Sequence, residues 1–178
     1  ARADSIALLV MNEMTNEMHV ISINRDTMTQ IRRYTMNGTD EGFYTTHLGY
    51  AFSYGDGGKV SCENLAEAVS KLFGNIPIRE YVVTNQDSMP YINDLVGGIT
   101  LTVPNSDLED KNPEFIAGEE VQITADNINT YLRYRDIGES FSNEGRMERQ
   151  KSYTIAYFDK LKNMNVRVWK NYGSLPGI

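Results

Sequence analysis

Residues 6–11 read Ile-Ala-Leu-Leu-Val-Met, a continuous apolar run near the start of the chain. An uninterrupted run of this length is typical of a strand that is buried on both faces. Residues 18–23 read as a second strand, and the short segment Met-Thr-Asn-Glu at residues 14–17 between the two favours a hairpin. The sequence therefore predicts that a buried β-sheet begins here.

Strand and helix patterns alternate along the rest of the chain, which is typical of the α/β class. We expect a single domain with a central mixed β-sheet flanked by helices. The last helix is expected to point Met147, Ile155, Phe158 and Leu161 inward. Further strands are predicted at residues 29–34, 81–84 and 99–103, helices at 60–73, 87–96, 124–132 and 143–162, a weak helical pattern at 45–54, and loops at 37–42 and 105–118, the latter exposed.

Charge and composition exclude several classes of function. The net charge is −7, with 24 acidic and 17 basic residues, which disfavours nucleic-acid binding. Cys62 is the single cysteine, so an intrachain disulfide is excluded, and two histidines argue against zinc. No run of 18 apolar residues and no signal peptide is visible. Because residue 1 is not methionine, we expect a piece of a longer protein.

Six of the ten arginines lie in three short blocks beside acids or a glutamine. Their planar guanidinium groups match phosphate oxygens two at a time and stay charged. One block follows the second predicted strand, where ligands bind in open α/β sheets. Together the blocks predict a pyrophosphate site. They are residues 2–4, residues 24–27, and residues 133–136 with 145–150, the last placing Arg146, Arg149 and Gln150 on one helix face.

Each of these residues also has a simpler interpretation. The arginines could form surface ion pairs, which are common and weak, with Asp136, Glu139, Glu144 and Glu148. Asp4 and Asp26 are the best metal candidates, although Asp26 could instead orient Arg25. His47 could be an acid or base, but a structural histidine is the commoner case. No P-loop and no Gly-x-Ser-x-Gly motif is present.

The order and spacing of the blocks resemble the LytR-CpsA-Psr family of cell-envelope proteins, found mainly in Gram-positive bacteria. The resemblance spans roughly Arg2 to Gln150. Residues 2–5 match the family's Arg-x-Asp-Ser/Thr, and residues 22–27 match its Ser-Ile-Pro-Arg-Asp-Thr with Asn24 in place of proline. Residues 47–55 match loosely. Further matches are residues 92–99 with 103–104, and residues 131–135 with 145–150.

The resemblance implies an α/β fold with an apolar interior that holds a polyprenyl tail. It implies a transferase that moves a glycopolymer, such as teichoic acid or capsule, from a polyprenyl-pyrophosphate carrier to peptidoglycan, assisted by Mg²⁺ or Mn²⁺. Asp4 would be the metal ligand, and Arg25, Asp26, Arg133 and Arg135 the catalytic residues. The pyrophosphate would be bound by Arg2, Arg25, Arg133, Arg135, Arg146, Arg149 and Gln150.

The resemblance also implies a setting and leaves alternatives open. Residues 1–162 would be the catalytic domain, and residues 163–178 an unplaced extension. The family has a membrane helix, a strand and an aspartate upstream of the first block, which predicts a protein anchored at the extracellular face of the cytoplasmic membrane. Two other functions need the same arginines: a regulatory module that binds polyprenyl phosphate without transfer, and a hydrolase of the lipid pyrophosphate.

Overall fold

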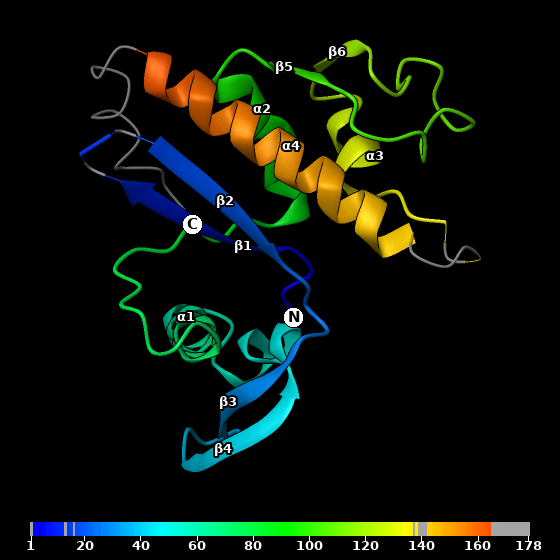
Figure 1. Cartoon of the computed structure of the whole chain (residues 1–178). Coiled ribbons are helices and arrows are strands. Elements are labelled where there is room, and N and C mark those ends of the chain that lie inside the picture. Colours follow the sequence, from blue (N-terminus) through cyan, green and yellow to red (C-terminus); the bar gives the residue numbers. More distant parts are fainter. Residues whose placement is uncertain (1, 13, 16, 137, 139–141, 165–178) are drawn as a thin grey trace. The chain divides into compact units, whose positions relative to one another are not determined.

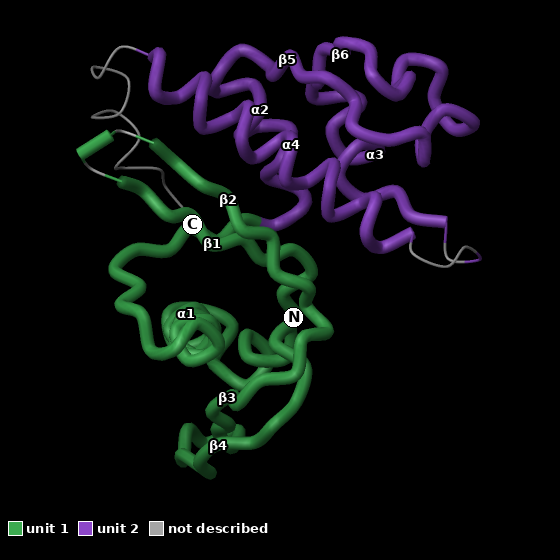
Figure 2. The backbone as a smooth tube through the Cα atoms, viewed as in Figure 1, with its two compact units in different colours: residues 1–84 green, residues 85–178 purple. Residues whose placement is uncertain are grey.

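A computed structural model describes residues 2–12, 14–15, 17–136, 138 and 142–164. The chain is a mixed α/β domain, which confirms the predicted class. It contains two compact units, unit 1 (residues 1–84) and unit 2 (residues 85–178), shown in Figure 2. Most of the extension predicted at residues 163–178 lies outside the described residues.

Unit 1 is built from two antiparallel hairpins and a helix (Figure 1). Strands β1 (Ile6–Asn12) and β2 (Glu17–Ile23) pair with Ile6 opposite Ile23. Strands β3 (Met28–Tyr34) and β4 (Asp40–His47) pair with Met28 opposite His47. The short 3-10 helices η1 (Leu48–Tyr50) and η2 (Phe52–Tyr54) follow, and then helix α1 (Lys59–Leu72).

The core of unit 1 lies between the hairpins and α1. Ile31 of β3, Leu48 and Ala51 are fully buried, and Ala68 and Val69 of α1 pack in the same cluster. Gly74 follows α1 with a φ of 77° and donates its backbone N–H to the Lys71 carbonyl at 3.1 Å. A left-handed residue of this kind ends a helix at little cost when it is glycine.

Unit 2 packs three helices against one hairpin. Its elements are η3 (Gln86–Ser88), α2 (Met89–Leu95), β5 (Ile99–Thr102), β6 (Glu120–Ile123), α3 (Ile128–Arg133) and α4 (Ser142–Asn163). β5 and β6 are antiparallel, with Ile99 opposite Ile123. Leu108 and Phe115, from the long connection between these strands, are fully buried in the same cluster as Tyr131.

Most predicted elements are confirmed. The hairpin of β1 and β2, strands β3 and β5, and helices α1, α2 and α4 lie within a few residues of the predicted ranges. Helix α3 begins later than residue 124, because Thr124 forms a turn in which its backbone N–H donates to Asn127 Oδ1 at 2.8 Å. The weak helical pattern at residues 45–54 becomes η1 and η2 after the end of β4.

The predicted central sheet is wrong in its arrangement. The described strands form three separate two-stranded antiparallel sheets. β1 is not buried on both faces: Leu9, Val10 and Met11 are 38%, 41% and 60% exposed. The physical reason is that β1 pairs with β2 alone among the described strands, and this hairpin is only partly covered: Ile6 packs in the core of unit 1, whereas Leu9, Val10 and Met11 are left exposed.

Tertiary contacts correct three further predictions and add two strands that were not predicted. Residues 81–84 form no strand, since no described segment pairs with them. β4 and β6 were not predicted, and their strands are defined by pairing with β3 and β5. The predicted exposed loop at residues 105–118 is anchored by Leu108 and Phe115. Ile155 of α4 is 37% exposed, whereas Tyr153, at 4%, faces the core.

None of the helices in the described part of the chain combines the length and the apolar character that a membrane crossing requires.

Candidate functional site

Three segments of unit 1 that are distant in sequence meet through backbone hydrogen bonds. Ala3 donates its N–H to the Gly49 carbonyl at 3.2 Å, and Gly49 donates to the Arg25 carbonyl at 2.8 Å. Leu48 donates to the Thr27 carbonyl at 2.8 Å. The first two arginine blocks therefore lie next to each other at η1.

Gly49 permits this close approach. A Cβ atom at residue 49 would lie 2.9 Å from the Ala3 carbonyl oxygen and 3.2 Å from Arg25 Cβ. Both distances are shorter than ordinary van der Waals contact, so any larger residue would push the segments apart. The sequence showed a glycine here, but nothing in the sequence identified which backbone it approaches.

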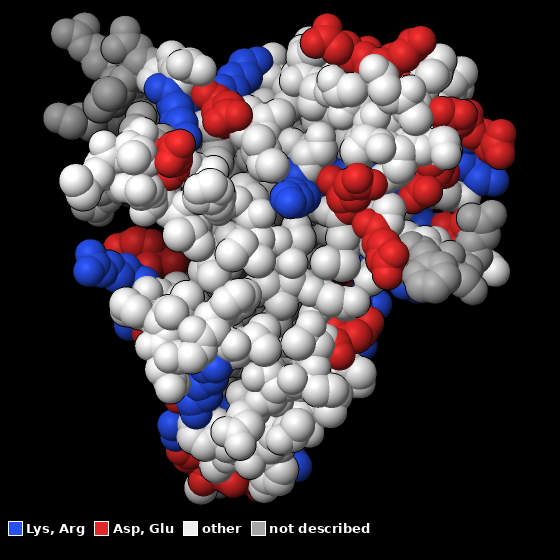
Figure 3. Space-filling view, in the orientation of Figure 1, with Lys and Arg blue, Asp and Glu red and all other residues white. Residues whose placement is uncertain are grey.

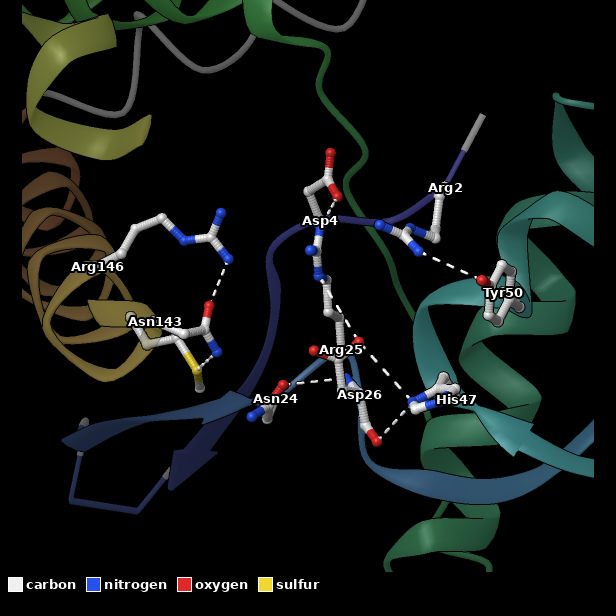
Figure 4. A network of polar contacts seen from close by, with 10 residues as sticks. Arg2, Asp4, Asn24, Arg25, Asp26, His47, Tyr50, Asn143 and Arg146 are labelled. Carbon is white, nitrogen blue, oxygen red and sulfur yellow. Dashed lines mark hydrogen bonds and ion pairs between the residues drawn. The ribbon is translucent and has the colours of Figure 1, made fainter. Parts of the chain in front are cut away.

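Arg25 is the centre of this group (Figure 4). Its Nη1 donates to Asp4 Oδ1, and its Nε lies 3.9 Å from Asp26 Oδ1. The Arg25 side chain is 17% exposed, whereas those of Asp4 and Asp26 are 48% and 53% exposed. Nε is buried without a hydrogen-bond partner. Two acids thus flank the guanidinium: Asp4 accepts a hydrogen bond from it, and Asp26 lies within ion-pair distance.

His47, Tyr50 and Arg2 border the same group. His47 Nδ1 lies 2.9 Å from the Asp26 carbonyl oxygen and 3.8 Å from Asp26 Oδ1. Its ring meets the Tyr50 ring edge-on, with centroids 6.1 Å apart. Arg2 Nη1 donates to the Tyr50 hydroxyl at 3.4 Å, and its guanidinium lies 5.3 Å from the centre of that ring. Tyr50 was not predicted as a site residue. Its place in the sequence next to Gly49 was the feature that could have indicated it.

The acids of unit 1 fit a metal ion only with help from other ligands. Among the described residues, no three His, Cys, Asp or Glu side chains gather into a group that could hold a metal. Asp4 is half exposed and supplies one carboxylate. Mg²⁺ commonly takes one or two protein carboxylates and completes its octahedron with waters and substrate phosphates. Asp4 suits that kind of site.

The arginines of unit 2 separate into exposed and buried members. Arg133 is exposed and Arg135 is half-buried, and neither side chain has a hydrogen bond or ion pair to another described residue. Arg146 is half-buried, and its Nη2 donates to Asn143 Oδ1 at 2.6 Å. Surface ion pairing therefore does not account for Arg133 and Arg135 within the described residues, although Glu139, one suggested partner, lies outside them.

Arg149 and Gln150 face the interior of unit 2. The Arg149 side chain is 0% exposed and pairs with Asp107 through Nη1 at 2.8 Å. Gln150 Nε2 donates to the Leu132 carbonyl at 2.9 Å. Both side chains therefore donate to acceptors on the chain itself, and the spacing in the sequence did not reveal this inward direction. Convergence of the arginines of both units on one anion stays a prediction.

The local environment of Tyr131 agrees with a dry interior beside Arg149. Tyr131 is fully buried, and burial raises the pKa of its phenol to about 12. Elsewhere on the face shown in Figure 3, acidic and basic side chains lie near each other at several places.

Solved structures resemble the chain over most of its length. The Lin1025 protein from Listeria innocua has a TM-score of 0.68 and 25% identity, covering 95% of this chain and 63% of that one. The crystal structure of Bacillus subtilis TagV has a TM-score of 0.66 and 26% identity, covering 90% of this chain and 57% of that one.

Proteins of similar sequence are found as well. A polyisoprenyl-teichoic acid–peptidoglycan teichoic acid transferase, TagU of Bacillus cereus, is 29% identical over 162 residues, which are 89% of this chain and 47% of that protein. TagV of Bacillus subtilis, named for the same activity, is 27% identical over 91% of this chain and 39% of its own length. The chain thus spans less than half of these relatives. The model of the LytR_cpsA_psr family matches residues 1–174, and the chain belongs to this family.

Proposed function

We propose that the chain is the catalytic part of a phosphotransferase of cell-wall assembly. It would move an anionic glycopolymer from a polyprenyl-pyrophosphate carrier to peptidoglycan, the kind of activity for which TagU and TagV are named. The observation that carries the proposal is the state of Arg133 and Arg135. They present two guanidinium groups without acidic partners among the described residues, beside a buried supporting arginine.

The transfer is an in-line displacement at phosphorus. The oxygen of a peptidoglycan hydroxyl forms a bond to the glycan-side phosphorus, and the hydroxyl proton passes to water. The bond from that phosphorus to the bridging oxygen breaks, and polyprenyl phosphate leaves with the electron pair. Such reactions depend on positioning and charge neutralisation more than on covalent catalysis by the protein.

The predicted site residues would divide these tasks among them. Arg133 and Arg135 would bind the pyrophosphate oxygens and neutralise the charge that builds up on the leaving phosphate. Arg25, fixed by Asp4 and Asp26, would bind from unit 1 together with Arg2. Arg146 would contribute from the start of α4.

Asp4 would hold a divalent cation, Mg²⁺ or Mn²⁺, together with phosphate oxygens. Bound there, the cation would supply further charge neutralisation. Because peptidoglycan lies outside the cytoplasmic membrane, we also propose that the protein acts at the extracellular face, anchored to that membrane.

An assay with three separable products tests the proposal. The chain is incubated with Mg²⁺, a polyprenyl-pyrophosphate-linked glycan and peptidoglycan. Glycan joined to peptidoglycan, with release of polyprenyl phosphate, is the expected result. Free glycan without joined product would identify a hydrolase, and lipid that is bound but unchanged would identify a regulatory binding module. Either of the last two results would overturn the transferase.

A further inference from the structure

Side chains of α4 reach the backbone at the end of α3. Arg149 Nε donates to the Tyr131 carbonyl at 3.0 Å, and Arg149 Nη2 donates to the Tyr134 carbonyl at 2.5 Å. Gln150 Nε2 donates to the Leu132 carbonyl at 2.9 Å. The last carbonyls of a helix have no partners within the helix, so these donors satisfy oxygens that would otherwise be unpaired. We call this set of three hydrogen bonds the α3 clasp.

Arg149 is held from its other side as well. Its Nη1 donates to Asn105 Oδ1 at 3.2 Å and to Asp107 Oδ2 at 2.8 Å. Asn105 in turn donates to the Gly145 carbonyl at 3.0 Å. Gly145 has no side chain, and a Cβ there would overlap the Asp107 carboxylate. With a side chain that is 0% exposed, Arg149 presents no surface to a ligand.

The clasp holds the segment that carries the two unpaired arginines. Arg133 and Arg135 alternate in sequence with Leu132 and Tyr134, whose carbonyls are bound. Long side chains lose entropy when they bind a ligand, and a fixed backbone lowers that cost because fewer arrangements must be excluded. A site residue held by buried hydrogen bonds behind it keeps the geometry that binding requires.

We propose that Arg149 and Gln150 are positioning residues, which fix the spacing of Arg133 and Arg135 so that both guanidinium groups bind one pyrophosphate. The proposal rests on the proposed function for the identity of the ligand. It replaces the expectation that Arg149 touches the pyrophosphate itself. The physical reason is that all three nitrogens of Arg149 already donate to carbonyl and side-chain oxygens of unit 2.

The first test measures amide hydrogen exchange in the full chain without any ligand. Gln150→Leu removes one donor of the clasp, and we expect amides of residues 131–136 to exchange at least about tenfold faster. Lys151→Ala is the matched control, because Lys151 is exposed on the same helix turn. Exchange in Gln150→Leu that equals that of the unsubstituted chain would overturn the clasp.

The second test measures binding of inorganic pyrophosphate by calorimetry in a double-mutant cycle. Gln150→Leu is expected to weaken binding about tenfold in the otherwise unsubstituted chain. In the Arg133→Ala/Arg135→Ala background it is expected to have less than about a twofold effect, because it acts through those two side chains. An equal loss in both backgrounds would show direct contact and overturn the positioning role.

Arg149→Lys separates charge from geometry in the same assay. Lysine keeps the positive charge but cannot donate to Tyr131, Tyr134 and Asp107 together. Weakened pyrophosphate binding is expected, whereas unchanged binding would contradict the proposal. If the unsubstituted chain binds no pyrophosphate, the ligand and the proposed function are both overturned. The exchange experiment still shows in that case whether Gln150 holds the segment.

Discussion

Arg25 of unit 1 and the arginine pair of unit 2, Arg133 and Arg135, are stabilised in opposite ways. Arg25 lies between two acids, Asp4 and Asp26, that neutralise it directly. Arg133 and Arg135 have no acidic partner among the described residues, and the support is given to their backbone by Arg149 and Gln150. The comparison shows that one residue type can be positioned either through its charge or through the chain that carries it.

The difference has a consequence for ligand binding. An anion that approaches Arg25 must compete with Asp4 for the guanidinium, unless a cation neutralises that carboxylate. An anion that approaches Arg133 and Arg135 competes with no carboxylate among the described residues. We therefore expect unit 2 to contribute most of the phosphate affinity, and unit 1 to depend on the divalent cation.

The largest effect is expected from removing the unpaired arginines. Arg133→Ala/Arg135→Ala should lower the rate of glycopolymer transfer by about 10³-fold or more, because each arginine stabilises charge on the transferring phosphate. The melting temperature should change little, since neither side chain has a hydrogen bond or ion pair to another described residue. Arg33→Ala, which breaks an exposed ion pair with Glu41, is the control. Normal transfer by the double variant would refute the assignment of these arginines.

The next effect concerns stability. Arg149→Met should lower the free energy of unfolding by about 3 kcal/mol, because carbonyl acceptors and Asp107 lose a buried charged donor. Arg25→Met should cost only about 1 kcal/mol, since its acidic partners are half exposed and solvated. Urea denaturation of both variants measures the difference. Equal losses would contradict the distinction between a buried and a solvent-accessible support.

Gly49→Ala tests the junction in unit 1. The added Cβ meets the Ala3 carbonyl oxygen at 2.9 Å, so the variant should lose about 2 kcal/mol of unfolding free energy. It should also weaken the response of pyrophosphate binding to Mg²⁺, because Asp4 follows the displaced segment. Thr45→Ala, an exposed change on β4, serves as the comparison. A Gly49→Ala chain as stable as the Thr45→Ala chain would show that the junction can relax.

The smallest effect extends the comparison to tyrosines. Tyr131 of unit 2 is buried with a pKa of about 12, whereas Tyr44 of unit 1 is 45% exposed. A pKa that is raised in the folded state stabilises the fold below the unfolded value of about 10, and this stability is lost as the pH rises towards 12. At pH 11 the loss should be about 1 kcal/mol.

Unfolding of the unsubstituted chain and of Tyr131→Phe, followed from pH 9 to 11, measures this loss. The variant should show a shallower decline, because phenylalanine does not ionise. The same decline in both chains would contradict the assignment to Tyr131.

The sequence allowed much of the local structure to be predicted. The apolar stripe of α1 and the hairpin of β1 and β2 follow from periodicity, and the arginine blocks point to an anion site. Of the strands that were missed, β4 carries no clear apolar alternation, and β6 alternates polar and apolar residues over only four positions. A strand is defined by its hydrogen-bonded partner, and partners distant in sequence are not visible in a local window.

What the sequence could not predict about the candidate site has a related physical cause. Spacing alone placed Arg146, Arg149 and Gln150 on one face of α4, but it did not indicate what that face meets. Tertiary packing set the carbonyls of α3 and the Asp107 carboxylate against Arg149, so that it is buried. Likewise, only the fold showed that Gly49 contacts Ala3 and Arg25.

The sequence by itself therefore determined which residues carry charge, where most of the helices and strands form, and which family the motifs resemble. The tertiary structure decided which arginines are exposed and which are buried. This division has a physical reason: helix and strand patterns depend on neighbours within a few residues, whereas burial and hydrogen-bond partners depend on segments that meet only after folding.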